Sequence, residues 1–400
     1  MTTPSIGSGV RDTHAALTGA RAALELARGS VLRDQLAVQA VPAPTGEERA
    51  RAEWTAARMR TLGLQRVHID VVGNAIGLRA GTELGSPVVV CAHLDTVFPA
   101  STPLALSRAG ERYIAPGIGD NARGVAAMLA IAGAIDGRRV RTLRPIIFAA
   151  TTGEEGAGDL RGARALFDAL GNDVAAAVIL DGPGDDRVIH QALGAVRLRL
   201  EWRGGGGHSW ANFGVPNAIH AAAAAGASIA ALPLPRAPRT TLTVARMGGG
   251  LSINAIPDAA WLEVDLRSSS NHSLGQMERG LRHAAHVATE EEHARSRPGT
   301  PRLALTITTI GTRPSGEVPA TDPLVVVALD ATRLSGREPI LDCASTDANV
   351  PIARGIPTVA LGAGGSGGGA HTLAEWYDDR ESGVGLTRAL TVIAAAAGAH

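Results

Sequence analysis

Hydrophobic residues along the chain follow different periods, which predict helices near the N-terminus and then a strand-rich region. The alanine-rich stretch 13–26 and the stretch 45–62 predict helices. Thr45 followed by Glu48 fits a capping box at the start of the second helix. The alternating apolar residues of 67–78 then predict a hairpin of two strands.

From residue 87 onward, short apolar runs alternate with helical stretches. The run 87–92 predicts a buried strand. The pattern continues as helix 122–135, strand 146–150, helix 161–170 and strand 175–180, and it resumes near the C-terminus as helix 323–334, strand 357–361 and helix 386–397. Because strands that alternate with helices favour a parallel sheet covered on both faces, we predict an α/β fold with a mainly parallel sheet flanked by helices.

The middle of the chain breaks this alternation. Its order is strand 195–202, helix 217–231, strands 240–247 and 259–266, helix 274–293 and strand 303–310. This β-α-β-β-α-β order is that of a ferredoxin-like α+β domain. We therefore predict a discontinuous larger domain made of residues 1–187 and 312–400, with an inserted smaller domain at 188–311.

Length, charge and composition narrow the classes of function. At 400 residues the chain exceeds the usual span of one hydrophobic core, which agrees with two domains. The 38 basic and 38 acidic residues cancel, and no long run of either sign offers a surface for nucleic acid or an anionic membrane. The N-terminus lacks a basic stretch followed by an apolar run, and no segment of about 18 apolar residues suggests a membrane span. We expect a cytoplasmic protein with a small, weakly charged substrate.

The two cysteines restrict the type of metal site that the chain can form. Cys91 and Cys343 lack the CxxC spacing, which argues against a disulfide framework and against a thiolate zinc site. Any metal is therefore expected on histidine and carboxylate ligands, which suit catalytic zinc, manganese or cobalt.

Acidic and imidazole side chains follow the ends of several predicted strands. His93 and Asp95 close the strand 87–92, and their alternate positions place both on one side, where the aspartate can hold the imidazole of a metal-binding histidine. Further groups occupy loops of the same kind, namely Asp120, Glu154, Glu155, Asp181 and His371. Because ligands of open α/β sheets collect at the carboxyl ends of the strands, we expect these groups to share one pocket.

Each of these residues also has a purely structural interpretation. Asp120 could be a helix cap, Glu154 and Glu155 a solvated turn, and Asp181 a turn residue before Gly182. Their shared placement at strand ends favours a functional site, since caps and turns have no reason to choose that edge each time.

These motifs resemble those of a known enzyme family. HLDTV at 93–97, GIGDNARG at 117–124, the GEEG turn at 153–156, Asp181, GGGGHS at 204–209 and the final HT..E at 371–375 are similar to the dinuclear zinc hydrolases. That family includes peptidase T, bacterial glutamate carboxypeptidase, aminoacylase and acetylornithine deacetylase. The resemblance covers roughly residue 41 to the C-terminus. It implies two divalent metal ions, zinc first, with manganese or cobalt as alternatives.

The resemblance also implies a role for each residue at the strand ends. His93 and Asp181 would bind one metal, Glu155 and His371 the other, and Asp120 would bridge both. A shared carboxylate fits because two dications about 3.5–4 Å apart repel each other. Glu154 would be the general base that takes a proton from the attacking water.

In this family the inserted domain serves as a lid and commonly carries dimerisation, so the resemblance implies a homodimer. His208 resembles a histidine that stabilises the developing oxyanion, often in the partner's site. Asn254 and Arg267 resemble polar contacts to a substrate carboxylate. The alternatives are an exposed loop histidine for His208 and an ordinary strand-edge ion pair for Arg267.

Three functions are compatible with this sequence. The first is a metallopeptidase acting on di- or tripeptides, because the aminopeptidase-like members tend to have aspartate at the position of Asp181 and the deacylases glutamate. The second is a hydrolase of N-acyl amino acids or other C–N bonds with the same metal core. The third is a non-catalytic binding protein, which the complete ligand set and the presence of Glu154 disfavour.

Overall fold

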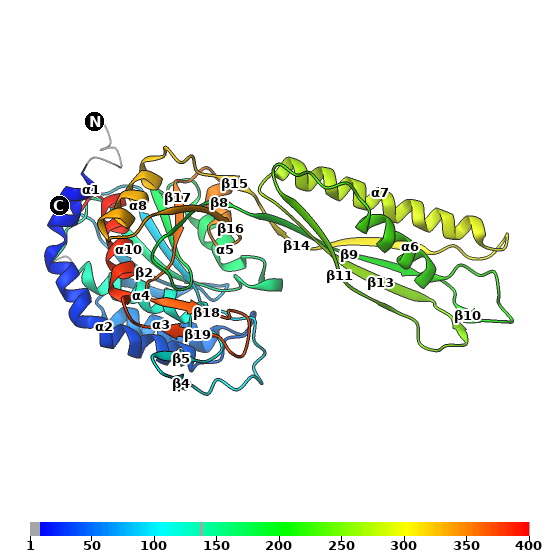
Figure 1. Cartoon of the computed structure of the whole chain (residues 1–400), viewed down its shortest axis with the longest axis horizontal. Coiled ribbons are helices and arrows are strands. Elements are labelled where there is room, and N and C mark those ends of the chain that lie inside the picture. Colours follow the sequence, from blue (N-terminus) through cyan, green and yellow to red (C-terminus); the bar gives the residue numbers. More distant parts are fainter. Residues whose placement is uncertain (1–8, 137–138, 400) are drawn as a thin grey trace. The chain divides into compact units, whose positions relative to one another are not determined.

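The computed structural model describes residues 9–136 and 139–399, and it divides the chain into two compact units (Figure 1). The first unit combines the N-terminal part through Ala192 with the C-terminal part from Glu317, and the second unit is Leu193–Gly316. We expected the division at 187 and 311. The strand β8 (Arg187–Ala192) joins the large sheet, which moves the first boundary beyond it. The first eight residues, part of the segment in which we expected no secretory signal, lie outside the described residues.

The first unit is built on one large sheet. Its strand order is β1-β2-β6-β3-β7-β17-β8-β15, and β16 pairs with β8. The strands are β1 (Gln65–Ile69), β2 (Ala75–Arg79), β3 (Val88–His93), β6 (Ile146–Thr151), β7 (Ala176–Leu180), β15 (Gly316–Glu317), β16 (Ile340–Ala344) and β17 (Thr358–Leu361). The central pairs β6/β3, β3/β7 and β7/β17 are parallel, and the hairpin β1/β2 is antiparallel. The prediction of a mainly parallel sheet is confirmed.

Helices flank this sheet (Figure 1). They are α1 (Val10–Ala16), α2 (Thr18–Gln39), α3 (Arg49–Thr61), α4 (Ala122–Ala134), α5 (Arg161–Leu170), α8 (Pro323–Leu334), α9 (Asn349–Ala353) and α10 (Ser382–Ala396). All residues of β3 and β7 are buried, as expected for parallel strands with helices on both faces. Apolar residues at 3.6-residue spacing alone do not fix a helix's length: the expected helix 13–26 is interrupted at Leu17, and α2 continues because Val31 and Val38 extend its buried stripe.

The capping box predicted at the start of α3 is wrong. Glu48 is itself the N-cap residue, and its carboxylate accepts hydrogen bonds from the backbone N–H of Gly46 (2.9 Å) and of Gly153 (3.0 Å). The hydroxyl of Thr45 donates to Asp95 Oδ2 at 2.8 Å. Both side chains therefore hold loops of the first unit instead of the helix terminus.

The second unit has the predicted ferredoxin-like order. Its elements are β9 (Gly194–Arg203), α6 (Ala218–Ala230), β11 (Thr240–Gly249), β13 (Ala259–Ser268), α7 (Asn271–Arg295) and β14 (Ala304–Arg313). The antiparallel sheet runs β11-β13-β9-β14, and its buried face packs against α6 and α7. In a separate two-stranded sheet, β10 (Gly207–His208) pairs antiparallel with β12 (Ala255–Ile256), which joins the loop after β9 to the loop before β13.

One small sheet was not predicted. It joins β4 (Ser107–Ala109), β5 (Arg112–Ile114), β18 (Ser366–Gly368) and β19 (Trp376–Asp378) in the order β18-β19-β5-β4. The strands are too short to show a period in the sequence, but they connect the glycine-rich loop near His371 to the segment before Asp120.

None of the helices among the described residues combines the length and the hydrophobicity of a membrane span.

Candidate metal centre

Parallel strands of the large sheet end at the same edge, and the predicted residues follow those ends. His93 closes β3, the turn with Glu154 and Glu155 follows β6, and Asp181 follows β7. In a parallel sheet the carboxyl ends of neighbouring strands meet, which brings these side chains to one place.

Asp120 and His371 reach the same place from loops. Asp120 precedes Asn121, the N-cap residue of α4, whose side chain accepts a hydrogen bond from Gly124 N (3.0 Å) and donates one to Leu180 O (2.9 Å). This second bond ties the start of α4 to the end of β7, beside Asp181. His371 follows β18 and has a positive φ of 65°.

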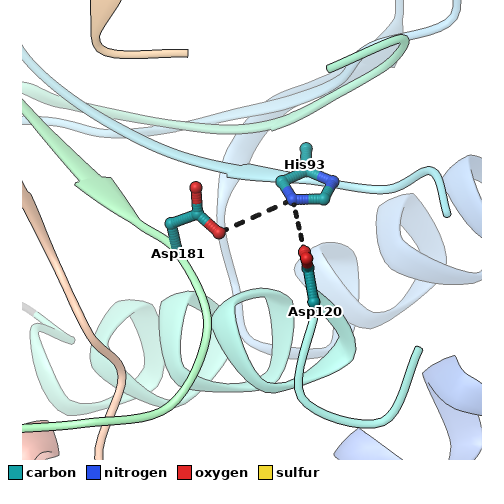
Figure 2. Close-up of side chains that lie close together, drawn as sticks. All are labelled: His93, Asp120 and Asp181. Atoms are coloured by element: carbon teal, nitrogen blue, oxygen red, sulfur yellow. Dashed lines mark ion pairs between the residues drawn. The ribbon is translucent and has the colours of Figure 1, made fainter. Parts of the chain in front are cut away.

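Two aspartates converge on His93. Its Nε2 lies 3.0 Å from Asp120 Oδ1 and 3.7 Å from Asp181 Oδ1. Figure 2 shows both carboxylates pointing at the same ring nitrogen of His93, Asp181 from the left and Asp120 from below. His93 itself is 3% exposed, so water has little access to this contact.

A second cluster shares Asp120. His371 Nε2 lies 2.8 Å from Glu155 Oε1 and 3.2 Å from Asp120 Oδ2. Each oxygen of the Asp120 carboxylate therefore faces one histidine. His93, Glu154 and Glu155 form a third group of potential ligand atoms that all lie within 4.8 Å of one another.

These groups fit a pair of divalent cations. They comprise imidazole nitrogens and carboxylate oxygens, the ligand types of catalytic zinc sites. Asp120 Oδ1 is buried, and apart from the His93 ring nitrogen at 3.0 Å it has no hydrogen-bond partner among the residues that the structure describes. A buried oxygen of this kind carries a desolvation cost that a bound cation removes.

The electrostatics of the cluster also indicate a demand for positive charge. Burial opposes a charged His93, but its contacts with Asp120, Asp181 and Asp95 outweigh burial and raise the pKa of His93 well above its usual value. The hydrogen bond with Asp120 raises the pKa of His371 to about 9, although burial acts against it. Both shifts have the same cause, which is that the surrounding carboxylates favour positive charge at this place.

The pKa values of Asp120 and Glu155 shift in opposite directions. Burial favours a neutral Asp120, but the contacts with His371 and His93 outweigh it and hold the pKa of Asp120 far below its usual value. Burial and the nearby Asp120 carboxylate raise the pKa of Glu155. Neighbouring carboxylates that cannot all be ionised without a positive partner are expected where a cation binds.

Asp95 contacts His93 differently from the prediction that its carboxylate holds the imidazole. His93 Nδ1 is 3.2 Å from the backbone carbonyl of Asp95 and 3.6 Å from its carboxylate. The carboxylate accepts hydrogen bonds from the backbone N–H of Glu154 and of Glu155, both at 2.9 Å, and from Thr45. Burial opposes its charge, but His93 and the two amides outweigh burial and lower the pKa of Asp95 to about 2. Asp95 thus holds the turn that carries both glutamates.

The glutamate turn is buried, which contradicts its interpretation as a solvated turn. Glu154 is 4% and Glu155 7% exposed. Burying two adjacent carboxylates is costly unless they meet positive charge, which supports a functional role for the turn.

Sequence reasoning missed Glu375 as a separate site residue. It is 2% exposed, and its carboxylate accepts hydrogen bonds from the backbone N–H of Gly117, Gly119 and Asp120. The available signal was its place at the end of the HT..E motif, four residues after His371. Asp347, another buried carboxylate outside the predicted set, is 1% exposed and accepts a 2.5 Å hydrogen bond from Thr151.

The predicted substrate residues all lie in the second unit. His208 is exposed, and its Nδ1 accepts hydrogen bonds from the N–H of Trp210 at 3.2 Å and of Ala211 at 3.4 Å. Asn254 is also exposed and lies beside His208, because its carbonyl accepts a bond from Ser209 N (2.9 Å). Arg267 lies near the opposite end of β13, where it pairs with Asp265 Oδ2 at 2.7 Å, the strand-edge ion pair that we considered as its alternative.

Comparison with known proteins identifies the family. The model of "Peptidase family M20/M25/M40" matches residues 89–395. The comparison with curated proteins found no match. Among solved structures, the aminopeptidase PepT from Bacillus cereus is 22% identical, with 92% of this chain and 98% of that chain covered and a TM-score of 0.72.

Two further structures share the fold. The di-peptidase Dug1p from Saccharomyces cerevisiae is 12% identical, with 96% and 99% of the two chains covered and a TM-score of 0.76. YXEP from Bacillus subtilis, described as a dinuclear metal binding peptidase, is 15% identical, with 93% and 98% covered and a TM-score of 0.66. The chain belongs to peptidase family M20/M25/M40 and is a hydrolytic enzyme.

Proposed function

We propose that this enzyme binds two divalent cations and hydrolyses the amide bond of a di- or tripeptide. The observation that carries the proposal is the Asp120 carboxylate, with one oxygen 3.0 Å from His93 and the other 3.2 Å from His371. A carboxylate in this position can bridge two cations, and the bridge lowers their mutual repulsion.

The ligands divide into two sets around Asp120. His93 and Asp181 would hold one cation, and Glu155 and His371 the other. Zinc fits this donor set best, and manganese and cobalt accept the same ligands. When bound, the cations lower the pKa of water and polarise a carbonyl group.

Glu154 is the proposed general base. Its backbone N–H donates a hydrogen bond to Asp95. Glu154 also belongs to the group of potential ligand atoms, all within 4.8 Å of one another, that includes His93 and Glu155. Its carboxylate would take a proton from the attacking water and return it to the leaving nitrogen, a contribution of about 10²- to 10⁴-fold in rate.

The preference for peptides rests on two observations. By the resemblance, the aminopeptidase-like members tend to have aspartate at the position of Asp181, and two structures of similar fold are described as an aminopeptidase and a di-peptidase. His208, Asn254 and Arg267 of the second unit are the proposed substrate contacts. The second unit is also the proposed surface of a homodimer.

The test joins metal analysis to a substrate panel, with wild type and Glu154→Gln. We expect two cations per chain in both proteins, cleavage of unblocked di- or tripeptides by wild type, and a fall in kcat of about 10²- to 10⁴-fold in the variant. Glu292→Gln is the matched control, because Glu292 is also buried (5% exposed) but lies in the second unit.

Other results would change the assignment. Release of acyl groups from N-acyl amino acids without cleavage of unblocked peptides would establish the deacylase alternative. A wild type without any hydrolysis, indistinguishable from Glu154→Gln, would leave a binding protein.

A further inference from the structure

Glu375 connects the two parts of the proposed metal centre that come from loops. It lies four residues after His371 and directly before β19. Its Oε1 accepts hydrogen bonds from the N–H of Gly119 (2.7 Å) and Asp120 (2.8 Å), and its Oε2 accepts one from the N–H of Gly117 (2.8 Å). The carboxylate therefore binds the loop that carries Asp120 at three points.

The small sheet explains how Glu375 reaches this loop. β19 pairs with β5, and the ladder continues with a hydrogen bond from Ala115 N to Glu375 O (3.0 Å). The chain after β5 then turns its amides toward the side chain opposite. Gly119 leaves the necessary room, since a Cβ there would lie 3.1 Å from Glu375 Oε1.

The segment between His371 and Glu375 is held by its own hydrogen bonds. Thr372 Oγ1 donates to Gly369 O (2.7 Å), and Glu375 N donates to Thr372 O (3.2 Å). A shift of Glu375 would therefore move both His371 and the Asp120 loop. His371 belongs to one ligand set of the proposed centre, and Asp120 belongs to both sets.

We propose that Glu375 is a positioning residue that fixes the Asp120 loop against the His371 segment and so sets the affinity for both cations. The proposal rests on the metal centre of the proposed function. Charge-assisted hydrogen bonds from backbone amides are about twice as strong as neutral ones, and three of them leave the loop little freedom. A glutamine at this position offers one acceptor oxygen and turns an NH2 group toward the amides.

The experiment compares cation binding by wild type, Glu375→Gln and Glu375→Asp, with Glu292→Gln as the matched control for the loss of a buried carboxylate. Glu292 also accepts a backbone hydrogen bond, from Asn217 N at 2.8 Å, but in the second unit. Each protein is stripped with a chelator and titrated with Zn²⁺ in a calorimeter. Thermal unfolding of the stripped proteins is measured in parallel.

We expect Glu375→Gln to weaken both binding events by about 10- to 100-fold, the usual effect of losing a residue that holds metal ligands in place. Glu375→Asp keeps the charge and is expected to bind Zn²⁺ more tightly than Glu375→Gln. Glu292→Gln is expected to bind like wild type. If Glu375→Gln does not fold, the comparison of Glu375→Asp with wild type decides, and a weakening of both events is again expected.

Two results overturn the proposal and are distinguishable. Two wild-type binding events that keep their affinity in Glu375→Gln, or in Glu375→Asp where only that variant folds, show that Glu375 is structural only, even if the stripped variant melts earlier. A wild type that binds no Zn²⁺, manganese or cobalt overturns the proposed metal centre and this proposal together.

Discussion

Carboxylates gather in both units of the chain, but their partners differ. On the sheet of the second unit, Asp265 pairs with Arg197 at 3.1 Å and with Arg267 at 2.7 Å. Glu263 likewise pairs with Arg199 at 2.8 Å. Each carboxylate thus lies directly across the sheet from an arginine, the usual cross-strand arrangement.

At the strand ends of the first unit the partners are histidines and other carboxylates. Among the residues that the structure describes, no arginine pairs with Asp120, Glu155 or Asp181. The second unit neutralises its carboxylates with its own side chains, whereas the cluster of the first unit lacks permanent positive charge. This difference separates a structural charge network from a candidate cation site.

The largest effect is expected from Asp120→Asn. This change removes the carboxylate shared by both ligand sets, and we expect loss of at least one cation and a fall in kcat/KM of about a thousandfold, or about 4 kcal/mol. Metal analysis and peptide kinetics measure both. Asp330→Asn, on the exposed side of α8, is the control and should retain both cations. If Asp120→Asn kept both cations and full activity, the carboxylates of the first unit would not form the proposed cation site, and their contrast with the second unit would fail.

Removal of cations by a chelator should destabilise the first unit. A ligand present at 1,000 times its Kd stabilises the folded state by about 4.1 kcal/mol, which is lost on removal. Hydrogen exchange should therefore speed up at 117–120 and 153–155, while the strands of the second unit keep their protection. Exchange rates at 117–120 and 153–155 that stay the same after chelation would contradict this expectation.

Asp95→Asn should have a smaller effect. The asparagine can accept at one oxygen only, so one amide of the Glu154–Glu155 turn loses its partner. We expect kcat to fall by about 10- to 100-fold with near-normal content of the cation held by His93. Thr45→Val removes only the third hydrogen bond of Asp95 and should cost less. If Asp95→Asn and wild type had equal kcat values, the Glu154–Glu155 turn would not depend on Asp95 for its position.

The smallest effect is expected from Glu263→Gln in the second unit. Its arginine partners are partly exposed, and such ion pairs contribute about 0–1 kcal/mol to the free energy of unfolding. Chemical denaturation should detect at most this loss, and Zn²⁺ titration should match wild type. A weakened Zn²⁺ affinity in Glu263→Gln would show that the two charge networks are coupled.

Elements with strong local patterns could be predicted with accurate bounds. The helices 161–170 and 323–334 have the same ends in the structure as in the prediction. The ferredoxin-like order was likewise predictable, because the apolar residues of its strands and helices follow periods that can be seen within each element. The strands β4, β5, β18 and β19 were not, since three residues are too few to show a period.

The roles of several polar residues depended on partners far away in sequence. Thr45 and Glu48 match a local capping pattern, yet they bind Asp95 and Gly153. The backbone amides that donate to Glu375 lie 255 to 258 residues earlier in the chain. A local sequence pattern contains no information on such distant hydrogen-bond partners.

The sequence by itself determined the longer helices and strands and the chemistry that their residues can offer, because side-chain period and ligand type are local properties. The tertiary structure alone decided that His93 and His371 face the two oxygens of one carboxylate, and that buried carboxylates hold the loops around them. The physical reason is that hydrogen-bond geometry and burial are set when distant strand ends meet at one edge of the sheet.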